Sequence, residues 1–319
     1  MPGENAVTEK LALSILNAVG NTPLVRLNKL VPANCATVLV KLEYFSATGS
    51  YKDRMALAMI EEAEKRGALR PGMTVVEYTG GSTGTSLAFV CAVKGYRFRV
   101  VSSDAFAKEK LQTMRVFGAE LDLVPSEGGK ITADLIPRMV ERAREITAMQ
   151  PSYFTDQFRN SDILKGYEAL ANELVEQVGG PIDAFCGGVG TAGMIMGVAR
   201  VLRRLKPSPR IVALEPASSP AISKGVGGTH HIEGVGSGFV PPLLDKNFYD
   251  EARGIEEGEA RAMARRLARE EGIFAGTSTG MNVVAALALA RELGAGRTVV
   301  TVAVDTGLKY LAGDLYENH

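Results

Sequence analysis

The segment Cys186–Gly193, CGGVGTAG, holds three glycines in the spacing G-x-G-x-x-G, which is typical of a turn that binds a dinucleotide. It follows the strand-like run IDAFCGG and precedes the helical run AGMIMGVARVLRRLKP. The next apolar run, RIVALEP, places Glu215 where a dinucleotide-binding fold has the acid that holds a ribose. The segment therefore predicts a strand, a glycine-rich turn and a helix N-terminus that binds a phosphate group.

Strand-like and helical patterns alternate on both sides of this segment. TVVEYTG (74–80), RFRVVSSD (97–104) and ELDLVPS (120–126) predict strands, and a helical pattern follows each of them. The alternation pauses near residue 150 and restarts at residue 161. A repeated βα order predicts an α/β fold, with two doubly wound, mostly parallel three-layer αβα domains.

Composition restricts the classes of function. A chain of 319 residues and 33.9 kDa is too long for one simple core, so two domains are expected. Lys+Arg and Asp+Glu are both 36, and this balance gives no attraction to nucleic acid or to an anionic membrane. The N-terminus lacks the pattern of a secretory signal, and no apolar run approaches the roughly 20 residues of a membrane span. We therefore expect a cytoplasmic protein.

Cysteine and histidine usage argues against metal chemistry. Cys35, Cys91 and Cys186 are scattered without a C-x-x-C spacing, which predicts reduced thiols in apolar surroundings. The chain has three histidines, too few for a histidine-based zinc site or a Ser-His-Asp triad to be expected. We expect no metal.

Three glycine-rich turns share the same position before a helix. They are YTGGSTGT (78–85), GGVGTAG (187–193) and AGTSTG (275–280). Each offers backbone N–H groups, a positive helix end and small hydroxyl side chains, which together suit an anion. A dinucleotide-binding enzyme explains one of the three.

Lys52, in ATGSYKDRMALAMI, is the most informative single residue. It stands at the start of a predicted helix, with Asp53 in the first turn. The helix dipole disfavours a cation there, which lowers the pKa of an amine and suits it to form a Schiff base. The alternative is a surface lysine paired with Asp53.

Together these blocks resemble the cysteine synthase group of pyridoxal-phosphate enzymes, which have fold type II. The resemblance covers nearly the whole chain, and its blocks follow the family order: NAVGNTPLVRLN (17–28), SYKDR (50–54), TGGSTG (79–84), DQFRN (156–160), GGVGTAG (187–193), LEP (214–216), IEGVGSGFVP (232–241), GTSTG (276–280) and DTGLKYL (305–311).

The resemblance implies a domain organisation. A smaller N-terminal domain of residues 43–155 would close over the substrate. Residues 1–42 and 156–319 would form the larger domain, which holds the phosphate and the pyridine nitrogen. Pyridoxal 5′-phosphate would lie in the cleft between the domains, and the enzyme would be a homodimer.

The resemblance also assigns the cofactor-binding residues. Lys52 would form the Schiff base and move protons at the substrate α-carbon, Ser278 would face the pyridine nitrogen, and Ser82 would stand for the asparagine that contacts the 3′-oxygen. The phosphate cup, usually Gly-Thr-Gly-Gly-Thr, would be Gly190, Thr191, Ala192, Gly193 and Met194. Ala192 adds a methyl group and Met194 removes a hydroxyl, so Thr191 and the backbone N–H groups would carry more of the binding. Glu215 would then be an ordinary residue at a strand end. A helix N-cap is the alternative role for Ser278.

The substrate α-carboxylate would be held by one loop and one glutamine, namely Thr79, Gly80, Gly81, Thr83 and Gln157. Gly80 replaces a family serine, and Ser82 is the largest departure within the site. After DQFRN the chain is shorter than in the family members that make cysteine from an activated serine. This difference bears on the leaving group and the second substrate.

The predicted reaction is pyridoxal-phosphate-dependent β-replacement on an activated L-serine of the O-acetylserine or O-phosphoserine type. It would pass through an aminoacrylate intermediate to which a small nucleophile such as sulfide adds. A serine hydroxyl at position 278 cannot keep the pyridine nitrogen protonated, which favours loss of a β-substituent over transamination. The alternatives are β-elimination, as in a serine/threonine deaminase or cysteine desulfhydrase, and, more distantly, an NAD-dependent dehydrogenase or a catalytically quiet scaffold.

Overall fold

The computed structural model describes residues 11–130 and 134–317. Its α-helices are α1 (Lys52–Lys65), α2 (Ser82–Lys94), α3 (Lys108–Val116), α4 (Leu135–Met149), α5 (Ile163–Val178), α6 (Gly193–Leu202), the short α7 (Ala221–Lys224), α8 (Glu257–Arg266) and α9 (Thr277–Leu293). Single turns are η1 (Ile15–Ala18), η2 (Glu43–Phe45), η3 (Leu267–Glu271) and η4 (Gly307–Tyr310). The strands are β1 (Leu24–Arg26), β2 (Thr37–Leu42), β3 (Thr74–Tyr78), β4 (Arg97–Ser103), β5 (Glu120–Val124), β6 (Ser152–Phe154), β7 (Ala184–Gly188), β8 (Arg210–Pro216), β9 (Glu251–Ile255) and β10 (Thr298–Ala303).

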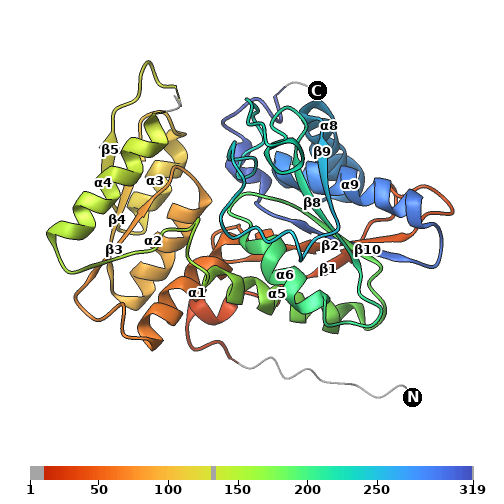
Figure 1. Cartoon of the computed structure of the whole chain (residues 1–319), viewed down its shortest axis with the longest axis horizontal. Helices are drawn as coiled ribbons and strands as arrows, with labels where there is room; N and C mark the ends of the chain where they lie inside the picture. The colour runs from red at the N-terminus through yellow and green to blue at the C-terminus, as the bar shows by residue number, and fades with distance from the viewer. Residues whose placement is uncertain (1–10, 131–133, 318–319) are drawn as a thin grey trace.

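Within the described residues the strands form two sheets. The larger has the order β1-β2-β10-β7-β8-β9, and the smaller has the order β5-β4-β3-β6. The pair β1–β2 is antiparallel, and the other strand pairs given for both sheets are parallel. Figure 1 shows the smaller sheet with α2, α3 and α4 on one side of the molecule and the larger sheet with α8 and α9 on the other.

The predicted α/β fold with two mostly parallel sheets is confirmed. Strands β3 and β7 are buried along their whole length, as expected where helices cover both faces of a sheet. The smaller sheet draws its strands from residues 74–154, and the larger one from 24–42 and 184–303. The exact domain boundaries stay a prediction.

Short strands are where the sequence was least informative. β6 lies in the pause near residue 150, and β1 and β9 add the two edges of the larger sheet. β1 and β6 have three residues each, too few for an alternating pattern to show. In the described part of the chain, no helix is long and apolar enough to cross a membrane.

One continuous buried apolar cluster joins the two halves. It runs from the side chains of α1 and α2, such as Met55 and Leu87, to those of α5 and α6, such as Leu170 and Ile195. Helix α1 packs against both α2 and α5. The helix that begins at Lys52 is therefore held by both halves of the molecule (Figure 1).

A buried ion network fixes α1 within this cluster. The guanidinium of Arg54 donates to Glu43 Oε2 at 2.7 Å and to Glu173 Oε1 at 2.7 Å. Lys41 Nζ lies 2.7 Å from Glu173 Oε2. The pKa of Glu173 is lowered to about 2: burial opposes this shift, and the hydrogen bond and charge of Arg54 outweigh it. The network ties the first turn of α1 to η2 and α5.

Replacing Arg54 by Met is expected to destabilise the fold by about 3–5 kcal/mol, because Glu43 and Glu173 would keep buried charge without the guanidinium. Urea-induced unfolding followed by circular dichroism measures this difference. Arg66→Met is the control, since it breaks an exposed pair with Asp162 at the end of the same helix and should cost about 0–1 kcal/mol. Equal losses in both variants would contradict the role of the network.

Candidate active site

Lys52 is the first residue of α1, and it is 8% exposed. The alternative of a surface pair with Asp53 is wrong, because Asp53 is bonded elsewhere. Its carboxylate accepts from Thr48 N–H at 2.8 Å, Thr48 Oγ1 at 2.6 Å and Ser86 Oγ at 2.6 Å. The acid at the helix start organises the preceding loop and α2 and leaves the Lys52 amine to other partners.

Burial lowers the pKa of the Lys52 amine to about 8, and the negative charge of Asp305 opposes this shift. The sequence predicted a lowered pKa from the helix dipole, whereas burial is the main cause in the folded protein. The amine also lies 4.7 Å from the centroid of the Tyr51 ring. About a tenth of Lys52 is therefore the neutral, nucleophilic amine at pH 7, far more than for an ordinary lysine.

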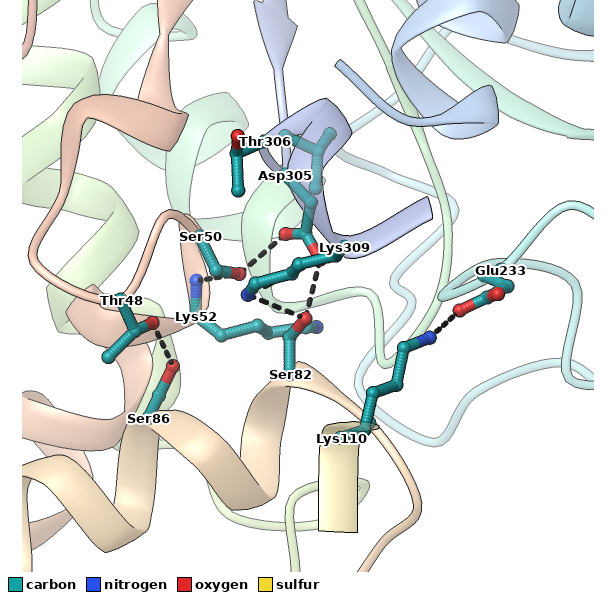
Figure 2. Close-up of polar contacts among 12 residues, drawn as sticks. Thr48, Ser50, Lys52, Ser82, Ser86, Lys110, Glu233, Asp305, Thr306 and Lys309 are labelled. Carbon is teal, nitrogen blue, oxygen red and sulfur yellow. Dashed lines mark hydrogen bonds and ion pairs between the residues drawn. The ribbon is translucent and has the colours of Figure 1, made fainter. Parts of the chain in front are cut away.

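Asp305, two residues beyond β10, links the elements around Lys52 and was missed by the sequence analysis. Its carboxylate accepts from Ser50 Oγ and from Ser82 Oγ, both at 2.5 Å. Lys309 Nζ donates to Ser82 Oγ at 3.2 Å and lies 3.9 Å from Asp305 Oδ2. Figure 2 shows these side chains converging from separate segments of the chain. The block DTGLKYL after a buried strand was the available signal.

The predicted phosphate cup, residues 190–194, bends sharply at the start of α6. A Cβ atom on Gly190 would lie 2.2 Å from the carbonyl oxygen of Gly234, so the close approach requires glycine. Ala192 has φ +68°, which is uncommon for a residue with a side chain. The first N–H groups of a helix lack acceptors within the helix, so this turn directs donors at an anion.

Met194 does not replace the missing hydroxyl of the cup with another polar group. Its side chain packs against Gly187 of β7. A Cβ atom at Gly187 would lie 2.4 Å from Met194 Cε, so only glycine leaves room for this side chain. Gly193 packs against Ile163 of α5 in the same way. Both residues serve the packing beneath the cup, while Thr191 is buried in its rim.

Ser278 lies in the first turn of α9 and is buried. The N-cap of α9 is Gly276, so the alternative that Ser278 caps this helix is wrong. Gly276 N–H donates to the carbonyl of Asp305 at 3.1 Å, which brings Ser278 to the same strand end as the Asp305 network. Asn282, one turn later, accepts from Gly188 N–H at 2.8 Å and so ties α9 to the strand before the cup.

The predicted carboxylate-binding residues form a second group. Thr83 Oγ1 donates to Gln157 Oε1 at 2.8 Å, so two residues 74 positions apart meet directly. Thr79 Oγ1 accepts from Gly81 N–H at 3.2 Å, and this bond shapes the loop of residues 79–81. A Cβ on Gly80 would lie 2.0 Å from the Phe106 ring, which explains the absence of the family serine.

Glu77 supports this group and was also missed. It is fully buried, and its carboxyl accepts from Thr155 Oγ1 at 2.7 Å, Tyr78 N–H at 2.9 Å and Gln157 N–H at 3.1 Å. Burial raises its pKa to about 8. The preceding residue of Gln157, Asp156, has φ +43°, so Glu77 stabilises a strained turn that presents Gln157.

Glu215 has an internal structural role. Its carboxylate accepts from Ile222 N–H at 2.7 Å, Ser223 N–H at 3.0 Å and Ser223 Oγ at 2.5 Å. The acid thus holds the start of α7, and a ribose would have to displace these bonds. Glu215, the acid that suggested a dinucleotide site, is therefore a structural residue that holds α7.

Comparisons with known proteins agree with this geometry. A family model described as pyridoxal-phosphate dependent enzyme matches residues 15–305. A cysteine synthase of Staphylococcus aureus (strain Mu50) is 41% identical over 312 residues, covering 97% of this chain and 99% of the relative. The solved structure of an O-ureido-L-serine synthase superposes with a TM-score of 0.89 at 37% identity, covering 97% and 96% of the two chains. A cysteine synthase from Entamoeba histolytica gives 0.92 at 33% identity, covering 100% and 95%.

The fold and the site therefore define a pyridoxal-phosphate dependent enzyme of fold type II. Within that class the chain belongs to the cysteine synthase family. Its cofactor is pyridoxal 5′-phosphate, and the dehydrogenase alternative is wrong.

The residues present fit this cofactor. The bent backbone at Gly190 and Ala192 would hold the phosphate, the amine of Lys52 would bond the aldehyde carbon, and the hydroxyl of Ser278 would face the ring nitrogen. Ser82 is hydrogen-bonded to Asp305 and Lys309, so the position of the family asparagine holds here a hydroxyl bonded to two charged side chains.

Loading of the cofactor should depend on pH through Lys52. The neutral amine attacks the aldehyde, and protonation below a pKa of about 8 removes it. The rate of colour formation when pyridoxal phosphate is added to the resolved enzyme should therefore fall by about tenfold per pH unit below that midpoint. Stopped-flow absorbance from pH 6 to 9.5 measures it. A midpoint near the ordinary lysine value of about 10.4 would contradict the burial argument.

Proposed function

We propose that this enzyme makes L-cysteine, or a close β-substituted alanine, by β-replacement on an activated L-serine of the O-acetylserine or O-phosphoserine type. Sulfide is the proposed nucleophile. The similarity to cysteine synthases supports this assignment. The single structural observation that carries it is the buried Lys52 amine, with a pKa of about 8, beside the Ser82 and Thr83 turn.

Recognition of the amino acid is proposed to fall to the second group of residues. The hydroxyls of Thr79 and Thr83, the backbone N–H groups at Gly80 and Gly81, and the amide of Gln157 would bind the α-carboxylate. Thr83 and Gln157 are already hydrogen-bonded to each other, so little side-chain entropy would be lost on binding. This loop therefore fixes the α-carbon relative to Lys52.

Bound pyridoxal phosphate supplies an aldehyde for covalent attachment and a conjugated ring that accepts the electron pair of the α-carbon. Lys52 would take the α-proton and hold it while the β-substituent departs. Ser278 would donate one neutral hydrogen bond to the ring nitrogen, which leaves that nitrogen unprotonated and the ring a weak acceptor of the electron pair. This favours departure of the β-group over long-lived charge at the α-carbon.

Excluding water from the site would protect the reacting amino acid from hydrolysis. Contacts between the two halves of the molecule would help to exclude it. Lys110 of α3 pairs with Glu233 of the segment after α7, and the Phe158 and Phe239 rings lie 5.3 Å apart (Figure 2 for the ion pair). These contacts join the smaller-sheet side to the loop 217–242. They would retard hydrolysis of the reacting amino acid.

The assay supplies O-acetylserine or O-phosphoserine with sulfide and measures both cysteine and pyruvate. Cysteine is the expected product, and the Lys52→Ala variant should lose turnover because the proton acceptor at the α-carbon is gone. Lys65→Ala is the matched control at the exposed end of α1 and should retain activity. Pyruvate without cysteine would instead establish β-elimination, and normal turnover by Lys52→Ala would overturn the mechanism.

We further propose a homodimer. Leu11, Leu13 and Ile15 at the N-terminal side of the described chain are 86%, 90% and 52% exposed, which is unusual for adjacent apolar side chains. A second copy would bury them. Sedimentation should give twice 33.9 kDa. Leu13→Glu should shift the equilibrium toward monomer, whereas Leu123→Glu on the smaller sheet should leave it unchanged; a wild-type monomer would contradict the proposal.

A further inference from the structure

We propose that Asp305 is a positioning residue for Lys52, which holds the loop before α1 and the first residue of α2 in one arrangement around the lysine. The inference rests on the proposed function, since it assigns the group that places the lysine for that reaction. Asp305 lies two residues beyond β10 of the larger sheet, and it contacts the loop before α1 and the start of α2 in the other half of the chain.

The first contact runs through Ser50 to the backbone of Lys52. Ser50 Oγ accepts from Lys52 N–H at 3.2 Å and donates to Asp305 Oδ1 at 2.5 Å. Backbone bonds reinforce it, because Thr306 N–H donates to Gly49 O at 2.9 Å and Tyr51 N–H donates to Val304 O at 3.1 Å. The carboxylate therefore anchors the residue that starts α1.

The second contact runs through Ser82. Its hydroxyl donates to the other oxygen, Asp305 Oδ2, at 2.5 Å, and accepts from Lys309 Nζ at 3.2 Å. Ser82 begins α2, the helix that carries Thr83. Figure 2 shows Ser50 and Ser82 reaching the same carboxylate from different segments, with the Lys52 side chain extending toward Ser82. One acid thus sets the distance between the lysine and the carboxylate-binding turn.

Charge accompanies the geometry. The side chain of Asp305 is 10% exposed, so its charge is little screened by solvent. The titratable groups that face it from the packed elements are Lys52, Lys309, Tyr51, Tyr167 and Tyr310. Burial raises the pKa of the three phenols well above their ordinary value, so they stay neutral. Burial lowers the pKa of the Lys52 amine, and the negative charge of Asp305 opposes this shift. Asp305 therefore holds that pKa higher than burial alone would.

Three variants separate position from charge. Asp305→Asn removes the charge and one of the two acceptor oxygens. Ser50→Ala removes both hydrogen bonds of the Ser50 hydroxyl and keeps the charge of Asp305. Asp305→Glu keeps the charge and displaces it by one methylene. Glu120→Gln, at the exposed first residue of β5, is the control for loss of a carboxylate elsewhere.

Two readouts are compared, kcat for cysteine formation by the holoenzyme and the pH midpoint of cofactor loading onto the resolved enzyme. For Asp305→Asn we expect kcat to fall by about 100-fold and the midpoint to fall by about one unit. Ser50→Ala and Asp305→Glu should lose kcat while the midpoint stays within a few tenths of wild type. Glu120→Gln should change neither. If Asp305 had only a structural role, Asp305→Asn would lower the yield of folded protein without moving the pH midpoint of cofactor loading.

A folded Asp305→Asn variant with wild-type kcat and an unmoved midpoint would overturn the inference. If that variant fails to fold, wild-type kcat in both Ser50→Ala and Asp305→Glu overturns it. Failure of the proposed function looks different, since the wild-type enzyme would then form no cysteine while its loading midpoint still reports on Asp305.

Discussion

The junction between the start of α1 and the end of β10 is the constraint on which the rest of the site depends. Parallel strands end at one edge of their sheet, and β10 lies centrally in the larger one. The residues just after β10, Val304 and Thr306, bond the loop before Lys52, while Asp305 O accepts from the turn that starts α9. The segment before Lys52 in one half of the chain and the turn before Ser278 in the other are therefore bonded to a single strand end.

Energetic cost accompanies this arrangement. Lys52 and Glu77 are ionisable groups with little exposure, and desolvation disfavours their charged forms. The buried pairs of Arg54 and Lys41 give no large net stability in such surroundings, but they penalise any other placement of α1. The apolar cluster shared by α1 and α5 supplies the driving force, and the charges determine a unique orientation. The same low exposure that is costly for folding makes the Lys52 amine reactive near neutral pH.

Departures from the family pattern have physical reasons once the neighbours are known. Gly80 faces the Phe106 ring, and Met194 fills space above Gly187, so both changes are matched by packing. Ser82 is shorter than asparagine, and Asp305 with Lys309 occupies its surroundings. Phe106 and Asp305 are far in sequence from the residues they explain, while Gly187 lies in the same turn segment as Met194. Pattern reading could locate the altered positions, but it could not say what compensates for them.

Local chemistry in the sequence determined the strand–turn–helix units, the parallel sheets, the glycine-rich turns and Lys52, because hydrophobic period, glycine spacing and a lysine at a helix start are properties of adjacent residues. The resemblance to a known family located Thr83 and Gln157 as separate motifs. Only the tertiary structure decided that these two bond each other, that Glu77 supports them, that Asn282 ties α9 to the strand before the phosphate cup, and that Asp305 joins Ser50 to Ser82. The reason is distance along the chain: hydrogen bonds between residues 74 to 255 positions apart depend on how the sheets and helices pack, and no local period encodes that.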